Sequence, residues 1–247
     1  MTVQTQQDLD KLRAIGTIVR LSLEAMTRAA CPGMTTAELD AVCAAVLAEH
    51  GAEASPAKVY NFPGTACISV NEEAVHGIPG ERKLAAGDLV KCDVTAEKDG
   101  YVADSAVTVR VGAVAPEAEA LARCAERAFT QGLRAAKVGN RIRDIGRAVE
   151  REVRHQGFSV IRELCGHGVG RSIHEQPTVP NYYDARFDTK LTNGLVLTIE
   201  PIIAAGSGRV RVQSDKWTIR TRDKSLAAHY EHSIVITNSG PVLLTAA

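Results

Sequence analysis

Four acidic residues of this chain lie in segments that are otherwise apolar, and their placement restricts the possible folds more than any other feature. They are Asp93 in LVKCDV, Asp104 before an alternating apolar run, Glu200 at the centre of GLVLTIEPIIAA, and Glu231 before HSIVIT. A carboxylate removed from water costs several kcal/mol unless a counter-charge or a metal ion compensates it. A salt bridge in the core would explain one such acid, whereas four of them indicate a shared cation.

Two of these acids are predicted to lie on one face of a hairpin. The dipeptide Asp99-Gly100, between two β-type segments, is a strong signal for a two-residue turn. With this turn Thr95 pairs with Asp104, and Asp93 becomes the diagonal neighbour of Asp104, with Cβ atoms about 7–8 Å apart. That separation suits two carboxylates that bind metal ions about 3.5–4 Å apart. For this pair alone, a solvated strand face explains the acids equally well.

Three histidines lie in glycine-containing segments. His167 and His174 belong to LCGHGVGRSIHEQP, and His76 belongs to the turn-like segment VHGIPG. The alternating glycines disfavour a continuous helix, and the first segment also lacks the lysine and the spacing of a phosphate-binding loop. Because the chain also carries four acids in apolar segments, we interpret His167 and His174 as candidate metal or substrate ligands. By itself, His76 would be an ordinary loop residue.

The remaining pattern predicts an α+β protein built mainly on an antiparallel sheet. Helices are expected over residues 7–30, 36–51, 117–136 and 142–156, and a loop over residues 52–66. The second helix carries a capping-box signature, with Thr35 followed three residues later by Glu38. Strands are expected over residues 67–70, 89–95, 101–111, 159–164, 194–203, 210–220 and 229–237.

The order of two helices followed by strands occurs twice along the chain. Leu39, Cys43, Leu47 and Gly51 are matched 106 residues later by Ile145, Val149, Val153 and Gly157. Such a match is weak on its own and gains weight from the repeated order of elements. We interpret residues 1–247 as a single catalytic domain with two similar halves, about residues 7–112 and 113–247.

Charge and cysteine content exclude several classes of protein. The 29 basic and 29 acidic residues give a formal net charge of zero, without the basic character of a nucleic-acid-binding domain. The six cysteines form no CxxC motif, the first residues lack the apolar core of a signal peptide, and no run of about 18 apolar residues would span a membrane. We therefore expect a cytoplasmic protein with free thiols that binds neither nucleic acid nor membranes.

Taken together, these segments resemble the type I methionine aminopeptidases. The resemblance rests on CISVNEEAVHGIPG, DVTAEKDGYVADSAVTV, CGHGVGRSIHEQP, LTIEP and the stretch 217–237 with HYEH, which follow one another over essentially the whole chain. It implies the pita-bread fold, in which two similar halves surround a central antiparallel sheet. It also implies a monomeric hydrolase that removes the N-terminal methionine from nascent chains with a small second residue, with contact to the ribosome left open.

The resemblance further implies two divalent metal ions, chosen from Mn²⁺, Fe²⁺, Co²⁺ and Zn²⁺. The implied ligands are Asp93, Asp104, His167, Glu200 and Glu231, of which Asp104 and Glu231 would contact both ions. A hydroxide between the two ions would attack the substrate, and Glu200 would act as the general base. By the same resemblance, His174 would bind the substrate carbonyl and His76 the scissile amide nitrogen.

The methionine side chain needs an apolar, polarisable pocket, for which the resemblance implies Tyr60, Phe62, Cys67 and Trp217. The chain departs from the family pattern at three positions. Ile173 stands where an aromatic ring is frequent, Val59 stands near a position that is often Tyr, and His229 stands where a polar amide is common. We expect these changes to alter the shape of the pocket and leave the ligands intact.

Two other functions remain as alternatives. One is an Xaa-Pro-directed aminopeptidase or prolidase of the same fold, although such relatives carry an additional N-terminal domain for which 247 residues leave no room. The other is a non-catalytic binding module that has kept the fold and lost the metals. Release of Xaa from Xaa-Pro peptides would favour the first, and absence of bound metal would favour the second.

Overall fold

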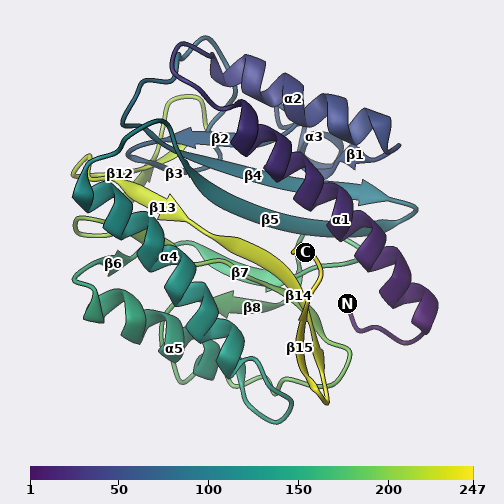
Figure 1. The fold of residues 1–247 in the computed structure, drawn as a ribbon. Helices are drawn as coiled ribbons and strands as arrows, with labels where there is room; N and C mark the ends of the chain where they lie inside the picture. Colours follow the sequence, from purple (N-terminus) through teal and green to yellow (C-terminus); the bar gives the residue numbers. More distant parts are fainter. Residues whose placement is uncertain (247) are drawn as a thin grey trace.

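A nine-stranded antiparallel sheet forms the centre of the structure, a computed structural model that describes residues 1–246 (Figure 1). Its strands follow the order β1 (Glu53–Ala54), β4 (Leu89–Lys98), β5 (Tyr101–Arg110), β14 (Glu231–Thr237), β9 (Val196–Ile199), β7 (Cys165–Gly168) and β8 (Glu175–Pro180). In addition, β2 (Cys67–Val70) pairs with β4, and β15 (Gly240–Leu243) pairs with β14. The predicted α+β architecture with a mainly antiparallel sheet is confirmed.

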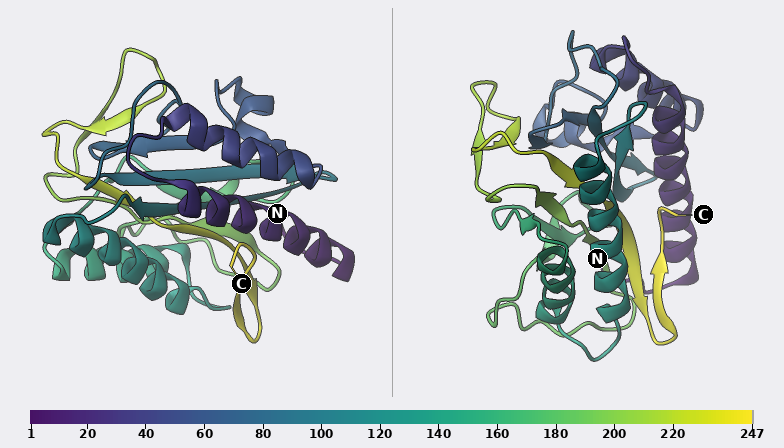
Figure 2. Two further views of the ribbon diagram at one scale, coloured as in Figure 1. Left: turned by 45° about the horizontal axis from the view of Figure 1, so that its top comes forward. Right: turned by 60° about the vertical axis from the view of Figure 1, so that its left-hand side comes forward.

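Two three-stranded sheets complete the strand structure. One contains β13 (Ala227–His229), β10 (Ile202–Ala204) and β6 (Ser159–Val160), and the other contains β11 (Val210–Val212), β12 (Ile219–Thr221) and β3 (Glu73–Val75). In the right-hand view of Figure 2, the segment with β11 and β12 projects on the side opposite α1 (Gln6–Ala29). This segment therefore lies away from α1.

Four long helices cover the central sheet in two pairs (Figures 1 and 2). The helices α1 and α2 (Thr36–Glu49) pack together, with α1 on β4 and β5. The helices α4 (Pro116–Ala135) and α5 (Ile142–His155) also pack together, with α4 on β9 and α5 on β8. The four predicted helices are thus confirmed. Among the described residues, no helix has the length and apolar character needed to cross a membrane.

The helices α2 and α5 occupy corresponding places in the two halves of the chain. Both bury the residues that the offset of 106 positions relates, and each helix is followed by a glycine with positive φ, Gly51 and Gly157. After these glycines, the amide of Ala52 donates to Leu47 O and the amide of Phe158 donates to Val153 O. The two helices therefore end in the same way.

The hairpin of β4 and β5 has the register predicted from its turn. Lys98 pairs with Tyr101 and Thr95 pairs with Asp104, so Asp93 and Asp104 are diagonal neighbours. Asp99 and Gly100 both have positive φ, as a tight hairpin turn requires. The capping box of α2 is confirmed as well, because the amide of Glu38 donates to Thr35 Oγ1 over 3.1 Å and the amide of Thr35 donates to Glu38 Oε2 over 2.7 Å.

Several predicted boundaries were wrong. The supposed loop 52–66 contains the short helix α3 (Ser55–Tyr60), which has Pro56 in its first turn, where proline loses no hydrogen bond. The supposed strand 194–203 is interrupted after β9 by Glu200 and Pro201, and β10 continues in a different sheet. Proline cannot donate to a strand ladder, which accounts for this break.

Three further segments differ from the prediction. Residues 159–164 form only the two-residue strand β6, whereas the neighbouring glycine-rich segment forms the strand β7. Residues 210–220 form the hairpin β11–β12, and residues 229–237 are divided between β13 and β14 at Tyr230. The strand β7 leaves no room for a side chain at two of its positions. A Cβ at Gly166 would clash with the carbonyl oxygen of Thr198, and a Cβ at Gly168 would clash with that of Gln176. Close strand packing thus outweighs the low strand preference of glycine.

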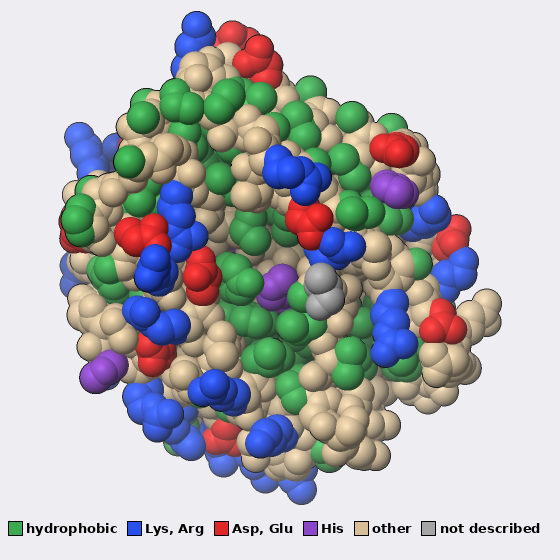
Figure 3. Space-filling view, in the orientation of Figure 1, with side chains coloured by type: hydrophobic (Ala, Val, Ile, Leu, Met, Phe, Trp, Pro, Cys, Tyr) green, Lys and Arg blue, Asp and Glu red, His purple; other side chains and the backbone are tan. Residues whose placement is uncertain are grey.

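Basic and acidic side chains are interspersed over the face of the molecule seen in Figure 3, with apolar groups near its centre. This distribution agrees with the equal numbers of basic and acidic residues in the sequence.

Candidate active site

All the predicted site residues line one cavity of about 530 Å³. They are Tyr60, Phe62, Cys67, His76, Asp93, Asp104, His167, His174, Glu200, Trp217 and Glu231. The volume falls within the range of about 300–1,000 Å³ that is usual for small-molecule sites. Residues separated by up to 171 positions in the sequence, from Tyr60 to Glu231, therefore meet at one place.

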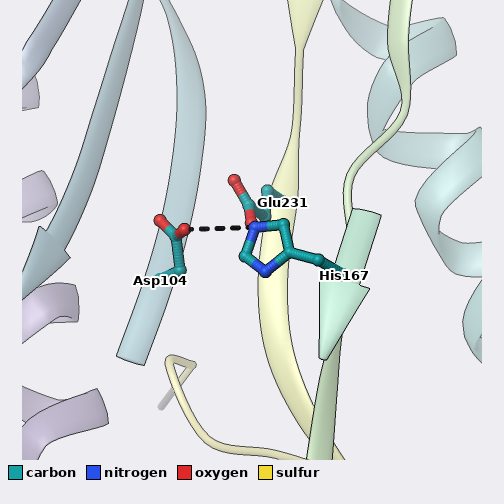
Figure 4. Close-up of side chains that lie close together, drawn as sticks. All are labelled: Asp104, His167 and Glu231. Carbon is teal, nitrogen blue, oxygen red and sulfur yellow. Dashed lines mark ion pairs between the residues drawn. The ribbon is translucent and has the colours of Figure 1, made fainter. Parts of the chain in front are cut away.

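Adjacent strands of the central sheet carry the acids and His167. Asp93 lies on β4, Asp104 on β5, Glu231 at the start of β14, Glu200 directly after β9, and His167 on β7. Figure 4 shows Asp104, His167 and Glu231 pointing toward one another from their strands. The Nε2 atom of His167 lies 3.7 Å from Asp104 Oδ2 and 3.5 Å from Glu200 Oε1. The sheet thus brings Asp104, Glu200 and Glu231 close to one imidazole.

Burial of the four carboxyl groups disfavours their ionised forms. Burial raises the pKa of Asp104 to about 7, although Thr95 Oγ1 donates a hydrogen bond to its Oδ1 over 2.9 Å. Burial, together with the charge of Asp104, holds the pKa values of Asp93, Glu200 and Glu231 well above their usual range. The four groups cannot all be ionised without positive charge nearby.

His167 presents a lone pair to these carboxyl groups. Its Nδ1 lies 3.0 Å from the carbonyl oxygen of Gly168, which can only accept a hydrogen bond, so Nδ1 carries the proton. Burial lowers the pKa of His167 to about 4 and keeps the ring neutral near pH 7. The Nε2 atom is therefore free to donate its lone pair, and the carbonyl contact at Nδ1 is typical of metal-ligating histidines.

The donor atoms fit a divalent metal centre. Two sets of three ligand atoms lie within 4.8 Å of one another, Asp104–His167–Glu231 and Glu200–His229–Glu231, while Asp93 belongs to neither set. The Oε1 atom of Glu231 is buried without a hydrogen-bond partner among the described residues. Such an orphaned carboxylate oxygen is costly unless a cation compensates it. Carboxylate oxygens combined with imidazole nitrogen suit the first-row divalent ions.

The remaining histidines border this cluster. His174 lies beside His167, with ring centroids 4.3 Å apart, and its Nδ1 is 2.8 Å from the hydroxyl of Tyr60. His76 follows β3 with a φ of 58°, an uncommon conformation for histidine. Burial lowers the pKa of both His76 and His174, which favours their neutral rings.

Apolar side chains form another part of the cavity wall. Phe62 and Trp217 pack edge to face with centroids 5.2 Å apart, and Ile173 also lines the cavity. Burial raises the pKa of the Cys67 thiol well above its usual value, so Cys67 offers a neutral packing surface. Val59 is 51% exposed and lies outside this cavity, beside a smaller neighbouring pocket.

Sequence reasoning did not identify the polar residues that accompany the acids. Thr198 Oγ1 donates to Glu200 Oε1 over 2.9 Å and accepts the amide of His167 over 3.0 Å. His229 was noted only as a departure from a family pattern, yet it lines the cavity beside Glu231. A signal for both existed in the sequence, because each lies two residues before an acid in a segment of β character, and side chains two apart in extended backbone point the same way.

The chain matches the model of metallopeptidase family M24 over residues 10–238. It is 47% identical to methionine aminopeptidase 2 of Bacillus subtilis, over 99% of each chain. Among solved structures, the methionine aminopeptidase of Thermotoga maritima superposes with a TM-score of 0.96 at 33% identity, with all of both chains covered. This likeness confirms the pita-bread fold.

The prolidase of Pyrococcus horikoshii shares the fold more distantly. It has a TM-score of 0.81 at 22% identity, and this chain covers only 64% of its length. The extra length of that protein agrees with the additional domain expected for proline-directed relatives.

Proposed function

The chain belongs to metallopeptidase family M24, and we propose that its cavity carries out the reaction of a methionine aminopeptidase, the hydrolytic removal of an N-terminal methionine. Divalent metal use follows from the family. The more specific proposal is that two ions, from Mn²⁺, Fe²⁺, Co²⁺ and Zn²⁺, are held by Asp93, Asp104, His167, Glu200 and Glu231. These residues supply four carboxylates and one neutral imidazole from a single buried cluster.

The convergence of four buried carboxyl groups in an otherwise largely apolar cavity is the observation that carries this proposal. Two divalent ions would balance four carboxylate charges. The ions, when bound, would supply Lewis acidity toward the substrate carbonyl and lower the pKa of a water molecule. The protein's part is to hold the donors in place, exclude bulk water and move protons.

Glu200 is the proposed general base. It lies directly after β9, where the break at Pro201 directs the chain away from the sheet, and Thr198 fixes its Oε1. A buried carboxylate with a raised pKa is suited to take a proton from the attacking water and return it to the leaving amine. Glu200 is therefore proposed both to bind metal and to carry the proton.

His174 and His76 are proposed to bind the peptide on either side of the scissile bond. His174 would donate to the carbonyl oxygen, where negative charge develops, and His76 would contact the amide nitrogen. Phe62 and Trp217, together with Tyr60 and Cys67, would enclose the methionine side chain. A narrow cavity beyond the scissile bond would favour substrates with a small second residue, such as the N-termini of nascent chains.

Peptide hydrolysis after metal removal and return tests this proposal. The protein is stripped with EDTA, reloaded with Co²⁺ or Mn²⁺, and assayed with Met-Ala-Ser and with Xaa-Pro peptides. We expect no release without metal and methionine release after reloading. Faster release of Xaa from Xaa-Pro peptides would favour the proline-directed alternative. Failure to bind either ion would favour a non-catalytic binding module.

The oligomeric state and contact with the ribosome remain predictions. Size-exclusion chromatography with light scattering checks the expected monomer, and co-sedimentation with ribosomes checks the contact.

A further inference from the structure

His229 points into the cavity from the strand that precedes Glu231. It ends β13, Glu231 begins β14, and the two are two residues apart in the chain. Two hydrogen bonds with Thr108 of β5 fix the backbone of His229, one of 2.9 Å from its amide and one of 2.8 Å to its carbonyl oxygen. The backbone that carries the imidazole is therefore held at a defined position in the wall of the site.

The ring nitrogens of His229 are buried without a hydrogen-bond partner among the described residues. The residue is 1% exposed, and neither Nδ1 nor Nε2 has a hydrogen-bond partner in the part of the chain that the structure describes. Its Nε2 nevertheless lies 3.2 Å from Glu231 Oε2, and His229, Glu231 and Glu200 each have one ligand atom within 4.8 Å of those of the other two. A buried polar group without a partner is costly, and a cation bound to Nε2 would compensate that nitrogen, while Nδ1 would keep its proton without an acceptor.

The distance between His229 and Glu231 suits two donors of one metal ion. Donor atoms about 2.1 Å from a single ion lie about 3.0–3.4 Å apart for tetrahedral or octahedral angles, and the observed 3.2 Å falls within this range. Imidazole nitrogen favours Fe²⁺, Co²⁺, Ni²⁺ and Zn²⁺ over Mg²⁺ and Ca²⁺. The cation is therefore a first-row transition ion.

We infer that His229 Nε2 is a nitrogen ligand of a divalent transition metal that it shares with Glu200 and Glu231. This inference rests on the proposed function, because it assumes a metal in the same cavity. It gives the centre a second imidazole, in a set that shares Glu231 with the set formed by Asp104, His167 and Glu231. The metal site is then richer in nitrogen than the five predicted ligands alone provide.

Counting the imidazoles on a bound ion tests the inference. The intact protein is loaded with Mn²⁺ or Cu²⁺ to two equivalents, and pulsed electron paramagnetic resonance reports coordinated nitrogens. We expect two imidazoles in the native chain and one in each of His229→Gln and His167→Gln. The exposed His155→Gln is the matched control and retains both.

Affinity for Co²⁺, measured by titration calorimetry, provides a second readout. We expect His229→Gln to weaken one binding step at least tenfold, with a changed visible spectrum of the bound Co²⁺. Loss of a group that only supports a ligand also weakens metal binding by about 10–100-fold. The number of imidazoles on the ion therefore decides whether His229 binds the metal or only supports a ligand.

Each outcome has a distinct meaning. One imidazole in the native chain, or none in His167→Gln, overturns the role of His229 while leaving the proposed function intact. These two results do not depend on the folding of a His229 variant. Absence of bound metal in the native chain overturns the proposed function itself.

Discussion

The hydroxyl of Tyr60 lies 2.8 Å from Nδ1 of His174. This contact joins helix α3 to the loop between β7 and β8. When the hydroxyl donates to Nδ1, a neutral ring carries its proton on Nε2, and burial favours the neutral ring by lowering its pKa. Tyr60 is 43% exposed, so the contact also lies at the entrance of the cavity. Tyr60 therefore orients the ring of the histidine proposed to bind the substrate carbonyl.

The first prediction concerns this contact. Tyr60→Phe should lower kcat about tenfold, the equivalent of one hydrogen bond, without loss of bound metal. His174→Ala should lower kcat more strongly, also with metal retained. In the double variant Tyr60→Phe/His174→Ala, the Tyr60 substitution should lower kcat little further, because Tyr60 acts through His174. Independent effects of the two substitutions on the hydrolysis of Met-Ala-Ser would show that the contact has no catalytic role. Loss of metal in His174→Ala would show that His174, and not His167, is the metal ligand.

The second prediction concerns the general base. Glu200→Gln should lower kcat by about 10²–10⁴-fold at saturating Co²⁺, because the amide cannot take up the proton of water. Metal content is measured in parallel, since the same side chain is a proposed ligand. The exposed Glu81→Gln serves as the matched control and should keep full activity. A Glu200→Gln variant that binds both ions and keeps more than a tenth of the native rate would exclude this role.

The third prediction concerns stability without metal. In the folded chain the pKa of Asp104 is raised from 3.8 to about 7, so its protonated form stabilises the fold at low pH, and this stabilisation is lost as the pH rises through 7. In EDTA, Asp104→Asn should therefore gain stability relative to the native chain between pH 5 and pH 8. The substitution also removes the charge that raises the pKa values of Asp93, Glu200 and Glu231, and this second effect stabilises the variant in the same direction.

Saturating Co²⁺ should reverse the order at pH 8, because the native chain gains binding free energy that the variant loses. Denaturant unfolding with and without Co²⁺ provides both comparisons. A difference between the chains that does not change with pH would contradict the raised pKa of Asp104.

The fourth prediction concerns the methionine pocket. Phe62→Ala removes the ring that packs edge to face on Trp217 and should raise KM for Met-Ala-Ser about tenfold, with a smaller effect on kcat. The preference for methionine over a smaller first residue should decrease as well. Steady-state kinetics with Met-Ala-Ser and Ala-Ala-Ser measure this ratio. An unchanged ratio would place the side-chain pocket elsewhere in the cavity.

Local patterns predicted much of the fold. The Asp99-Gly100 turn set the β4–β5 register, and the Thr35–Glu38 capping box marked the start of α2, because both depend on residues close in sequence. The breaks at Pro201 and Tyr230 were missed, since they depend on strands that leave one sheet for another. The helix α3 was missed because a six-residue helix has too short an apolar pattern.

The sequence alone determined that four acids occupy apolar segments, and it predicted a shared cation for them, because their neighbours in the chain already predict buried strands. Only the tertiary structure decided which side chains meet. The pairing of β5, β14, β9 and β7 brings His167 to Asp104, and the break between β13 and β14 leaves His229 beside Glu231, where its ring has no hydrogen-bond partner in the described part of the chain. Contacts between segments far apart in sequence arise from sheet pairing and burial, which local residue patterns do not specify.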